Sequence, residues 1–225
     1  MSSFYLRKFW GYNYLGFIIA CILAFNFISN ASAKRNEEVG MSSRFFSFVG
    51  GDSGSWRVTK SDTIIGEPLN NVKRLDIVAG ARVQSGLDTG WVLQGITSNE
   101  RYVVRDEKNQ LLAKQQGLGR PEATRAALIL IRKNAAWWAL TQDERRKILE
   151  DQSKHIQIGL RYLPAIARRL HHCRDLSENE PFDFITWFDF SPAHEADFNH
   201  LVAELRSSEE WKYVDREIDI RLDRE

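Results

Sequence analysis

The sequence predicts an α+β fold built on a ferredoxin-like β-α-β-β-α-β unit at residues 126–225. Three observations support this prediction. One stretch is continuously apolar, as in a buried strand, two later stretches alternate apolar with polar side chains, and helix-start signals lie between them. Residues 44–125 form an N-terminal half that we expect to be an abbreviated relative of the same unit.

The predicted unit begins with a strand and a long helix. Residues 126–131 are all apolar, which predicts a central strand ending at Lys133. Thr141 and Glu144 have the spacing of a capping box, so a helix should start there and run to about Tyr162. One stripe of this helix carries Ile148, Leu149, Gln152, His155, Ile156, Gly159 and Leu160.

Two strands should follow this helix. Residues 166–173 alternate, which predicts a strand with Arg168 on its buried face and therefore on a different element from His155. A turn at 177–181 leads to a strand at 182–190, whose side chains on one face are Phe182, Phe184, Thr186, Phe188 and Phe190.

A second helix and a last strand complete the unit. Ser191 is a natural N-cap and Pro192 suits the first helical position, so a helix should run to about Ser207. The last strand spans residues 213–222. We expect it to place Val214, Ile218, Ile220, Leu222 and, as an exception, Arg216 inward, with Asp215, Glu217, Asp219 and Arg221 facing out.

The N-terminal half has weaker signals. Short apolar stretches at residues 45–49, 75–78 and 91–93 are bounded by glycine-containing turns, which predicts strands and hairpins. Residues 107–116 are a candidate helix.

Residues 1–33 have the three-part layout of a secretory signal peptide. Two basic residues precede an apolar run at 15–28, and Ala31-Ser32-Ala33 offers a cleavage site, which would leave 34–43 as a flexible N-terminus. The apolar run is shorter than the roughly 20 residues of a membrane-spanning helix. The pattern therefore predicts export to the periplasm without stable membrane association after cleavage.

Other interpretations of this leader stay open. The apolar run could be a retained membrane anchor, or the chain could be a lipoprotein modified at Cys21. If Met41 is the true start, the protein stays in the cytoplasm.

Charge and cysteine content narrow the function. Lysine and arginine number 31 against 30 acidic residues, and cleavage would remove two basic residues and no acidic one. Such a balance gives no electrostatic basis for binding nucleic acid or a membrane surface. Cys173 would be the only cysteine after cleavage, so no intrachain disulfide forms. The sequence contains no C-x-x-C-H motif, so any haem would be held without thioether links.

A group of residues in the second half is suited to a flat, iron-bearing ligand. His155 lies on the apolar face of its helix, four residues before Gly159, where the missing side chain would let a macrocycle approach. Glu209 or Glu210 could hydrogen-bond the second ring nitrogen of an iron-ligating histidine. Arg168 would be a buried cation that needs an anion. We interpret this group as a haem site.

Three further residues fit the same interpretation. Trp137 and Trp138 can line an apolar cavity while their indole N–H groups donate to a propionate, and Lys133 can neutralise one. Each candidate also has a purely structural interpretation. His155 and the tryptophans could be core residues, Lys133 an exposed lysine, and Arg168 the partner of an acid such as Asp183 or Asp189.

Several separated motifs resemble the chlorite dismutases, a family of haem b proteins with a dimeric α/β-barrel fold, and in particular its short, dimeric members. The similarity runs through nearly all of residues 41–224. Its motifs are Ile131-Arg132-Lys133-Asn134-Ala135-Ala136-Trp137-Trp138, Glu144-Arg145, His155, Tyr162-Leu163, Arg168, Phe184-Ile185-Thr186-Trp187-Phe188 and the opening Val49-Gly50-Gly51-Asp52-Ser53-Gly54-Ser55-Trp56.

The resemblance implies a role for each candidate residue. It makes His155 the iron ligand on the proximal side, Glu210 its hydrogen-bonding acid, and Arg168 the distal arginine that separates true dismutases from coproheme-processing relatives. It also places Lys133, Trp137, Trp138 and, by a looser alignment, Tyr102 around the haem and its propionates. The rest of the distal pocket should be apolar.

The expected function is the decomposition of chlorite, a small anion, to chloride and dioxygen at haem b, by a protein that forms a homodimer. Two alternatives stay open. The chain could be a haem peroxidase or a coproheme-processing enzyme without chlorite turnover, or it could bind haem without catalysis.

Overall fold

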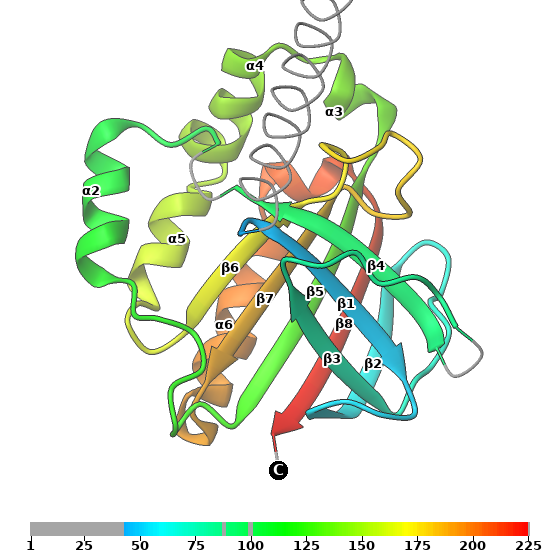
Figure 1. The fold of residues 1–225 in the computed structure, drawn as a ribbon. Helices are drawn as coiled ribbons and strands as arrows, with labels where there is room; N and C mark the ends of the chain where they lie inside the picture. The colour runs from blue at the N-terminus through cyan, green and yellow to red at the C-terminus, as the bar shows by residue number, and fades with distance from the viewer. Residues whose placement is uncertain (1–42, 87–88, 99–100, 225) are drawn as a thin grey trace, which may run out of the picture. The chain divides into compact units, whose positions relative to one another are not determined.

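The computed structural model describes residues 43–86, 89–98 and 101–224. The expected leader and almost all of the expected flexible N-terminus lie outside the described residues. The described chain forms one closed, entirely antiparallel barrel in the order β1-β3-β2-β8-β5-β7-β6-β4 (Figure 1). Its strands are β1 Phe45–Gly51, β2 Trp56–Ile65, β3 Arg74–Ala79, β4 Thr89–Thr97, β5 Arg125–Lys133, β6 Ala167–His172, β7 Phe184–Phe190 and β8 Val214–Arg224.

One described helix, α2 Arg105–Lys114, lies in the N-terminal half. The others lie in the second half and are α3 Ala135–Ala139, α4 Gln142–Arg146, the π-helix η1 Lys147–Gln152, α5 His155–Arg161, the short 3₁₀ turn η2 Pro192–His194, α6 Glu195–Arg206 and the 3₁₀ turn η3 Glu209–Tyr213.

Both halves of the barrel have the ferredoxin-like strand order. In the second half the order is β8-β5-β7-β6, and in the first half it is β4-β1-β3-β2, so the fourth strand of each unit lies beside its first. The described segments between β1 and β2 and between β3 and β4 contain no helix. The predicted fold class, including the abbreviated N-terminal relative, is confirmed. Sequence patterning missed β2, which pairs with β3 in its own half and with β8 in the other half.

The alternation of β5 explains its uninterrupted apolar sequence. Ala126, Leu128 and Leu130 belong to the core inside the barrel, where Trp56, Trp187 and Ile220 also lie. The intervening residues of β5 pack outside the barrel. Because both faces of the strand are covered, the alternation between apolar and polar residues disappears, as in a central strand.

A layer of helices covers the outer face of the second half (Figure 1). Phe198 and Leu201 of α6 pack there against Phe188 of β7, within a second apolar cluster. This cover corrects the prediction for β8. Glu217 and Asp219 do point out of the barrel, but they are buried beneath α6, where Arg206 pairs with both at 2.6 and 2.8 Å.

The helix expected from Thr141 to Tyr162 is interrupted. After the capping box of α4 the chain forms the π-helix η1, and Lys154 then adopts a left-handed conformation with φ of 56°. A new helix, α5, begins at His155. A lysine in the left-handed conformation has no sequence signal comparable to that of glycine. Because the apolar positions continue through Lys154 at helical spacing, the sequence does not indicate that the helix is interrupted there.

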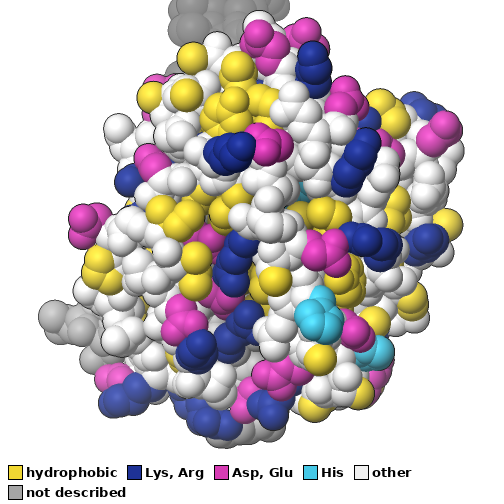
Figure 2. Space-filling model, turned by 180° about the vertical axis from the view of Figure 1, so that it is seen from behind, with side chains coloured by type: hydrophobic (Ala, Val, Ile, Leu, Met, Phe, Trp, Pro, Cys, Tyr) yellow, Lys and Arg dark blue, Asp and Glu magenta, His cyan; other side chains and the backbone are white. Residues whose placement is uncertain are grey.

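The visible surface agrees with the balanced composition. Figure 2 shows acidic and basic side chains interspersed over the face seen from behind. Within the part of the chain that the structure describes, no helix is both long and apolar enough to cross a membrane.

His171 of β6 makes the stability of the fold depend on pH. The ring lies between Phe46 and Phe48, and burial lowers its pKa to about 3. An unfolded histidine titrates near about 6.5. Between these pH values the unfolded chain binds a proton that the folded chain does not. The free energy of unfolding therefore decreases on acidification, by about 1.4 kcal/mol per pH unit for one such group.

We predict that His171→Gln weakens this acid sensitivity. Between about pH 6 and pH 4 its free energy of unfolding should fall less steeply than that of the wild type, by about one proton's contribution. Urea unfolding at a series of pH values measures both slopes. Equal slopes would contradict a neutral, buried His171.

Candidate functional site

A cavity of about 330 Å³ lies on the outer face of the second half of the barrel. Its floor is formed by side chains of β5, β6 and β7, and its walls come from α2, α5, α6 and η3. Most of the lining is apolar, with a few polar groups, as in small-molecule sites. The predicted site residues that line it are Tyr102, Lys133, Trp137, His155, Arg168 and Glu210.

His155 is at one end of a chain of polar contacts that runs through the buried carboxylate of Glu210 to Lys133. Its Nδ1 lies 2.6 Å from Oε2 of Glu210, and Nζ of Lys133 donates to Oε1 of the same carboxylate at 2.8 Å. Burial alone would raise the pKa of Glu210, but the electrostatic attraction of Lys133 and His155 and their hydrogen bonds to the carboxylate outweigh it and hold the pKa well below its usual range. The ionised carboxylate accepts from Nδ1–H, which leaves Nε2 with the lone pair that a metal would need.

The partner of His155 is thus Glu210 and not Glu209. Glu209 is exposed and pairs with Lys212 at 2.7 Å. The 3₁₀ turn η3 directs the side chain of Glu210 into the protein and that of Glu209 into solvent. The sequence alone left the choice between these two acids open.

The loop before α5 fixes the position of His155. The left-handed Lys154 reverses the chain so that His155 is the first residue of the helix. The buried carboxylate of Glu150 accepts from the backbone N–H of Ile156 at 2.8 Å, and Oγ of Ser153 accepts from the backbone N–H of Glu210, also at 2.8 Å. The same short segment therefore holds both the histidine and its carboxylate partner.

Arg168 brings an uncompensated positive charge to the cavity. It lies on β6, a different element from His155, as predicted. Burial lowers the pKa of its guanidinium, with no opposing contribution from an acid. Among the described residues the guanidinium has no ion pair, and the suggested partners Asp183 and Asp189 bind other groups. An arginine remains charged in such surroundings, so this position favours an anionic ligand.

Gly159 makes room for Arg168. A Cβ atom added at Gly159 would lie 2.1 Å from Nη1 of Arg168. In the structure the guanidinium of Arg168 lies in the space beside Gly159 where the sequence predicts that a macrocycle approaches.

The two tryptophans have different surroundings. Trp137 is buried, lines the cavity and lies beneath Nζ of Lys133, which is 4.7 Å from its ring centre. Its Nε1–H is buried without a hydrogen-bond partner in the described structure. Trp138 is not part of the cavity lining; its Nε1 donates to Asp183 at 3.2 Å and its ring stacks on Phe184. Only Trp137 has an N–H available for a ligand.

Tyr102 is held in an unusual backbone conformation at the edge of the cavity. Its φ is 65°, in the left-handed region that is costly for a side chain of this size. Arg146 donates to its carbonyl oxygen and Arg145 donates to its hydroxyl at 3.4 Å. Arg145 also donates to the carbonyl oxygens of Trp137 and Trp138. Arg145 therefore connects two walls of the site, a role that no local sequence pattern indicates.

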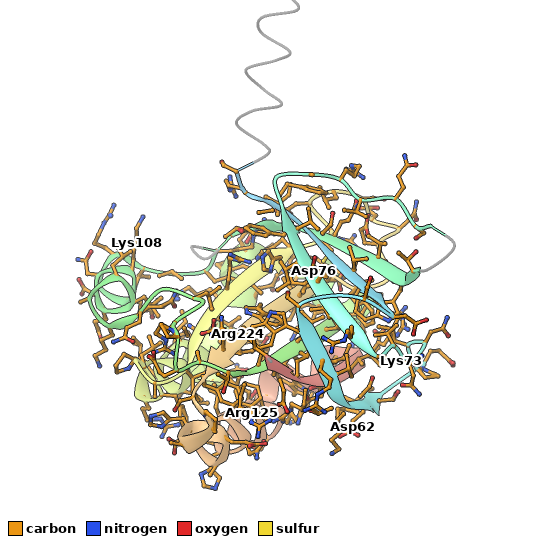
Figure 3. The ribbon with its side chains drawn as sticks, turned by 60° about the horizontal axis from the view of Figure 1, so that its bottom comes forward. Asp62, Lys73, Asp76, Lys108, Arg125 and Arg224 are labelled. Atoms are coloured by element: carbon orange, nitrogen blue, oxygen red, sulfur yellow. The ribbon has the colours of Figure 1, made fainter. Side chains whose placement is uncertain are left out.

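Helix α2 forms an exposed wall of the cavity. None of its residues is buried, and Leu112 is 72% exposed. Glu107 fastens the helix to Arg146 through hydrogen bonds of 2.7 and 2.9 Å. Figure 3 shows α2, marked by Lys108, on the side of the molecule away from β2, marked by Asp62.

Six polar residues of the cavity lining were not predicted as site residues. They are Arg101, Lys108, Gln115, His172, Thr186 and Glu217. His172 follows His171 directly on β6, so strand alternation places the two rings on opposite faces of the sheet. The rest of the pocket around Arg168 was expected to be apolar. This expectation is wrong in part, because Thr186 and His172 also line the cavity.

The donors in the cavity fit a flat, metal-bearing macrocycle with acidic groups. His155 has one ring nitrogen held by a carboxylate, which is the usual arrangement of a metal-ligating histidine. The buried indole N–H of Trp137 lacks an acceptor, and the guanidinium of Arg168 lacks an anion. The remaining lining is mainly aliphatic and aromatic. These are the properties that the expected haem would require.

The chain is similar to known proteins of one family. A family model described as chlorite dismutase matches residues 66–223. Over 123 residues the chain is 32% identical to the chlorite dismutase of Ideonella dechloratans, a match that covers 54% of this chain and 40% of that relative. The chain thus aligns with less than half of the length of this relative.

Solved structures agree with this family. The crystal structure of dimeric chlorite dismutases from Nitrobacter winogradskyi is 54% identical, with a TM-score of 0.73, and the match covers 80% of this chain and 99% of that one. The chlorite dismutase of Candidatus Nitrospira defluvii in complex with imidazole is 20% identical, with a TM-score of 0.57 and coverage of 84% and 95%. At that identity the second likeness supports the fold alone.

We predict that Lys133→Met destabilises the protein by about 3 kcal/mol, because it leaves the carboxylate of Glu210 with less compensation in a buried site. Glu210→Gln should have a similar cost, since it leaves Lys133 without its acid. The double variant should lose much less than the sum of the two. Urea unfolding of the four proteins measures this coupling, and simple additivity would contradict it.

Proposed function

The chain belongs to the chlorite dismutase family, and on that premise we propose that it is a haem b enzyme that decomposes chlorite to chloride and dioxygen. The observation that carries the proposal is the unpaired guanidinium of Arg168, placed in the same cavity as the His155–Glu210 pair. A site for a neutral substrate would have no need of this half-buried cation.

Different residues of the cavity would hold different parts of haem. His155 would provide the ligand for iron, and Glu210 would keep that imidazole in one orientation and one tautomer through the 2.6 Å hydrogen bond. Trp137 has a free indole N–H for an acidic edge group. When bound, haem would supply the iron centre at which the two oxygens of chlorite are oxidised to dioxygen while its chlorine is reduced to chloride.

Arg168 would bind and retain the anion. Chlorite and the oxychlorine anion formed from it carry a negative charge, and a fixed guanidinium in a poorly solvated cavity stabilises that charge with little reorganisation. The apolar side chains around it exclude water. Since the reactants are held until dioxygen forms, less of the oxidising anion escapes to damage the protein.

We predict that the haem-loaded protein evolves dioxygen from chlorite and that Arg168→Ala lowers kcat/KM by about 10- to 100-fold, the value of a hydrogen bond to a charged group. The variant should also bleach faster as oxidant escapes. Arg168→Lys, which keeps the charge, should recover part of the activity. An oxygen electrode measures the rates. A loaded wild-type protein that yields no dioxygen would exclude the dismutase function, and coproheme decarboxylation would then be the reaction to assay.

We predict that His155→Ala abolishes stable haem binding, because the iron loses its protein ligand. The matched control is His194→Ala, which removes a histidine from an exposed position at the start of α6, away from the cavity lining. Absorption spectra of both purified variants test this assignment. An unchanged Soret band in His155→Ala would show that another residue binds the iron.

We also propose a homodimer that works in the periplasm. The structure from Nitrobacter winogradskyi is described as dimeric, and the pattern of residues 1–33 supports export. Light scattering of the purified protein tests the first proposal. N-terminal sequencing of the native protein tests the second, by distinguishing a start at Lys34 from one at Met41 or Met1.

A further inference from the structure

His172 is a buried histidine that faces the cavity with both ring nitrogens unpartnered. It lies on the same face of β6 as Arg168 and Leu170, and all three line the cavity. The residue is 1% exposed, and within the described chain neither Nδ1 nor Nε2 has a hydrogen-bond partner. Its ring is held edge-on against Phe184, with 4.9 Å between ring centres.

The neighbouring His171 shows that this strand can satisfy a buried histidine. His171 faces the barrel interior, where Nδ1 lies 3.0 Å from the carbonyl oxygen of Ile185 and Nε2 accepts from Arg169 at 3.0 Å. His172 has no such bonds on the cavity side. Because buried polar groups are normally hydrogen-bonded, the unpaired ring indicates a partner that occupies the cavity.

The chemistry of the ring limits what that partner is. Burial, followed by the positive charge of Arg101, lowers the pKa of His172 to about 4. The ring is therefore neutral at neutral pH and has one N–H to donate. A carboxylate can accept from this N–H, whereas a cationic ligand group has no lone pair with which to accept it.

The position of His172 separates it from the reacting anion. Four residues of a strand span about 13 Å, so His172 and Arg168 are near opposite ends of the cavity. His172 pairs with Phe184 in register, next to the end of β5 where Lys133 lies. Arg101 lines the same cavity and is held by Asp175 at 2.6 Å. This end of the cavity therefore combines the unpartnered ring of His172 with the Arg101–Asp175 ion pair, which suits the polar edge of a large ligand.

We infer that His172 is a cofactor-binding residue whose imidazole donates a hydrogen bond to a carboxylate at the edge of the macrocycle, in a subsite to which Arg101 contributes the positive charge. The inference rests on the proposed function only in taking haem b as the ligand. It adds a carboxylate subsite on the strand side of the cavity to the indole N–H of Trp137.

The test compares ferric haem b with its dimethyl ester, which has the same ring but no free carboxylates. Full-length protein is loaded with either compound, and the rate of transfer to an excess of a haem-scavenging protein is measured. His172→Phe should release haem b about tenfold faster than the wild type, the factor expected for one hydrogen bond to a charged group. It should release the ester at the wild-type rate.

Two further variants separate recognition from packing. His172→Gln keeps an N–H donor and should release haem b at nearly the wild-type rate. Arg101→Gln changes a partly exposed side chain and should accelerate the release of haem b but not of the ester. His171→Gln, on the other face of the strand, is the matched control and should leave the ratio of the two release rates unchanged.

The possible outcomes are distinct. Equal acceleration of haem b and ester by His172→Phe, or no acceleration of either, would overturn the carboxylate subsite. A wild-type protein that binds no haem would overturn both this inference and the proposed function. A third outcome combines faster release of haem b, but not of the ester, by His172→Phe with a wild-type protein that evolves no dioxygen from chlorite. This outcome would support the subsite and exclude only the dismutase reaction.

Discussion

The buried carboxylate of Glu210 is the interaction on which the site depends. The carboxylate bonds Lys133 at the end of β5 and His155 at the start of α5. The backbone N–H of the same residue donates to Ser153 in the loop before α5. A carboxylate in such a place is stable only if its partners stay with it. The same bonds that orient the imidazole therefore also fasten the helical layer to the sheet, so that stability and metal-ligand geometry share one set of contacts.

The barrel wall separates the apolar core from the cavity that contains His155 and Arg168. Tryptophan, phenylalanine and branched aliphatic side chains fill the interior, whereas the cavity lies outside the sheet and beneath helices. In the described part of the first half, no helix lies between β1 and β2 or between β3 and β4. The two halves share a strand order, but the second half alone combines that sheet with the α5 and α6 cover that a ligand cavity requires.

Sequence patterns predicted the second half well because hydrophobic periodicity and capping residues dominate there. They could not predict the left-handed Lys154, whose conformation depends on packing, or the choice between Glu209 and Glu210, which depends on a single helical turn. Glu217 and Asp219 looked solvent-facing because their partner Arg206 lies on another element. Trp137 and Trp138 are identical side chains, and tertiary contacts alone distinguish the one with a free N–H from the one bonded to Asp183.

The alternation of β6 limits how this chain can evolve. Arg168, Leu170 and His172 face the cavity, while His171 and Cys173 face the barrel core and Arg169 lies over the ring of Phe46. Inserting or deleting one residue within the strand would exchange the two sets. The cavity would still receive an arginine and a histidine, but the barrel core would lose the side chains that fit it. Changes in length should therefore accumulate in the turn at residues 174–181 and be eliminated from the strand itself.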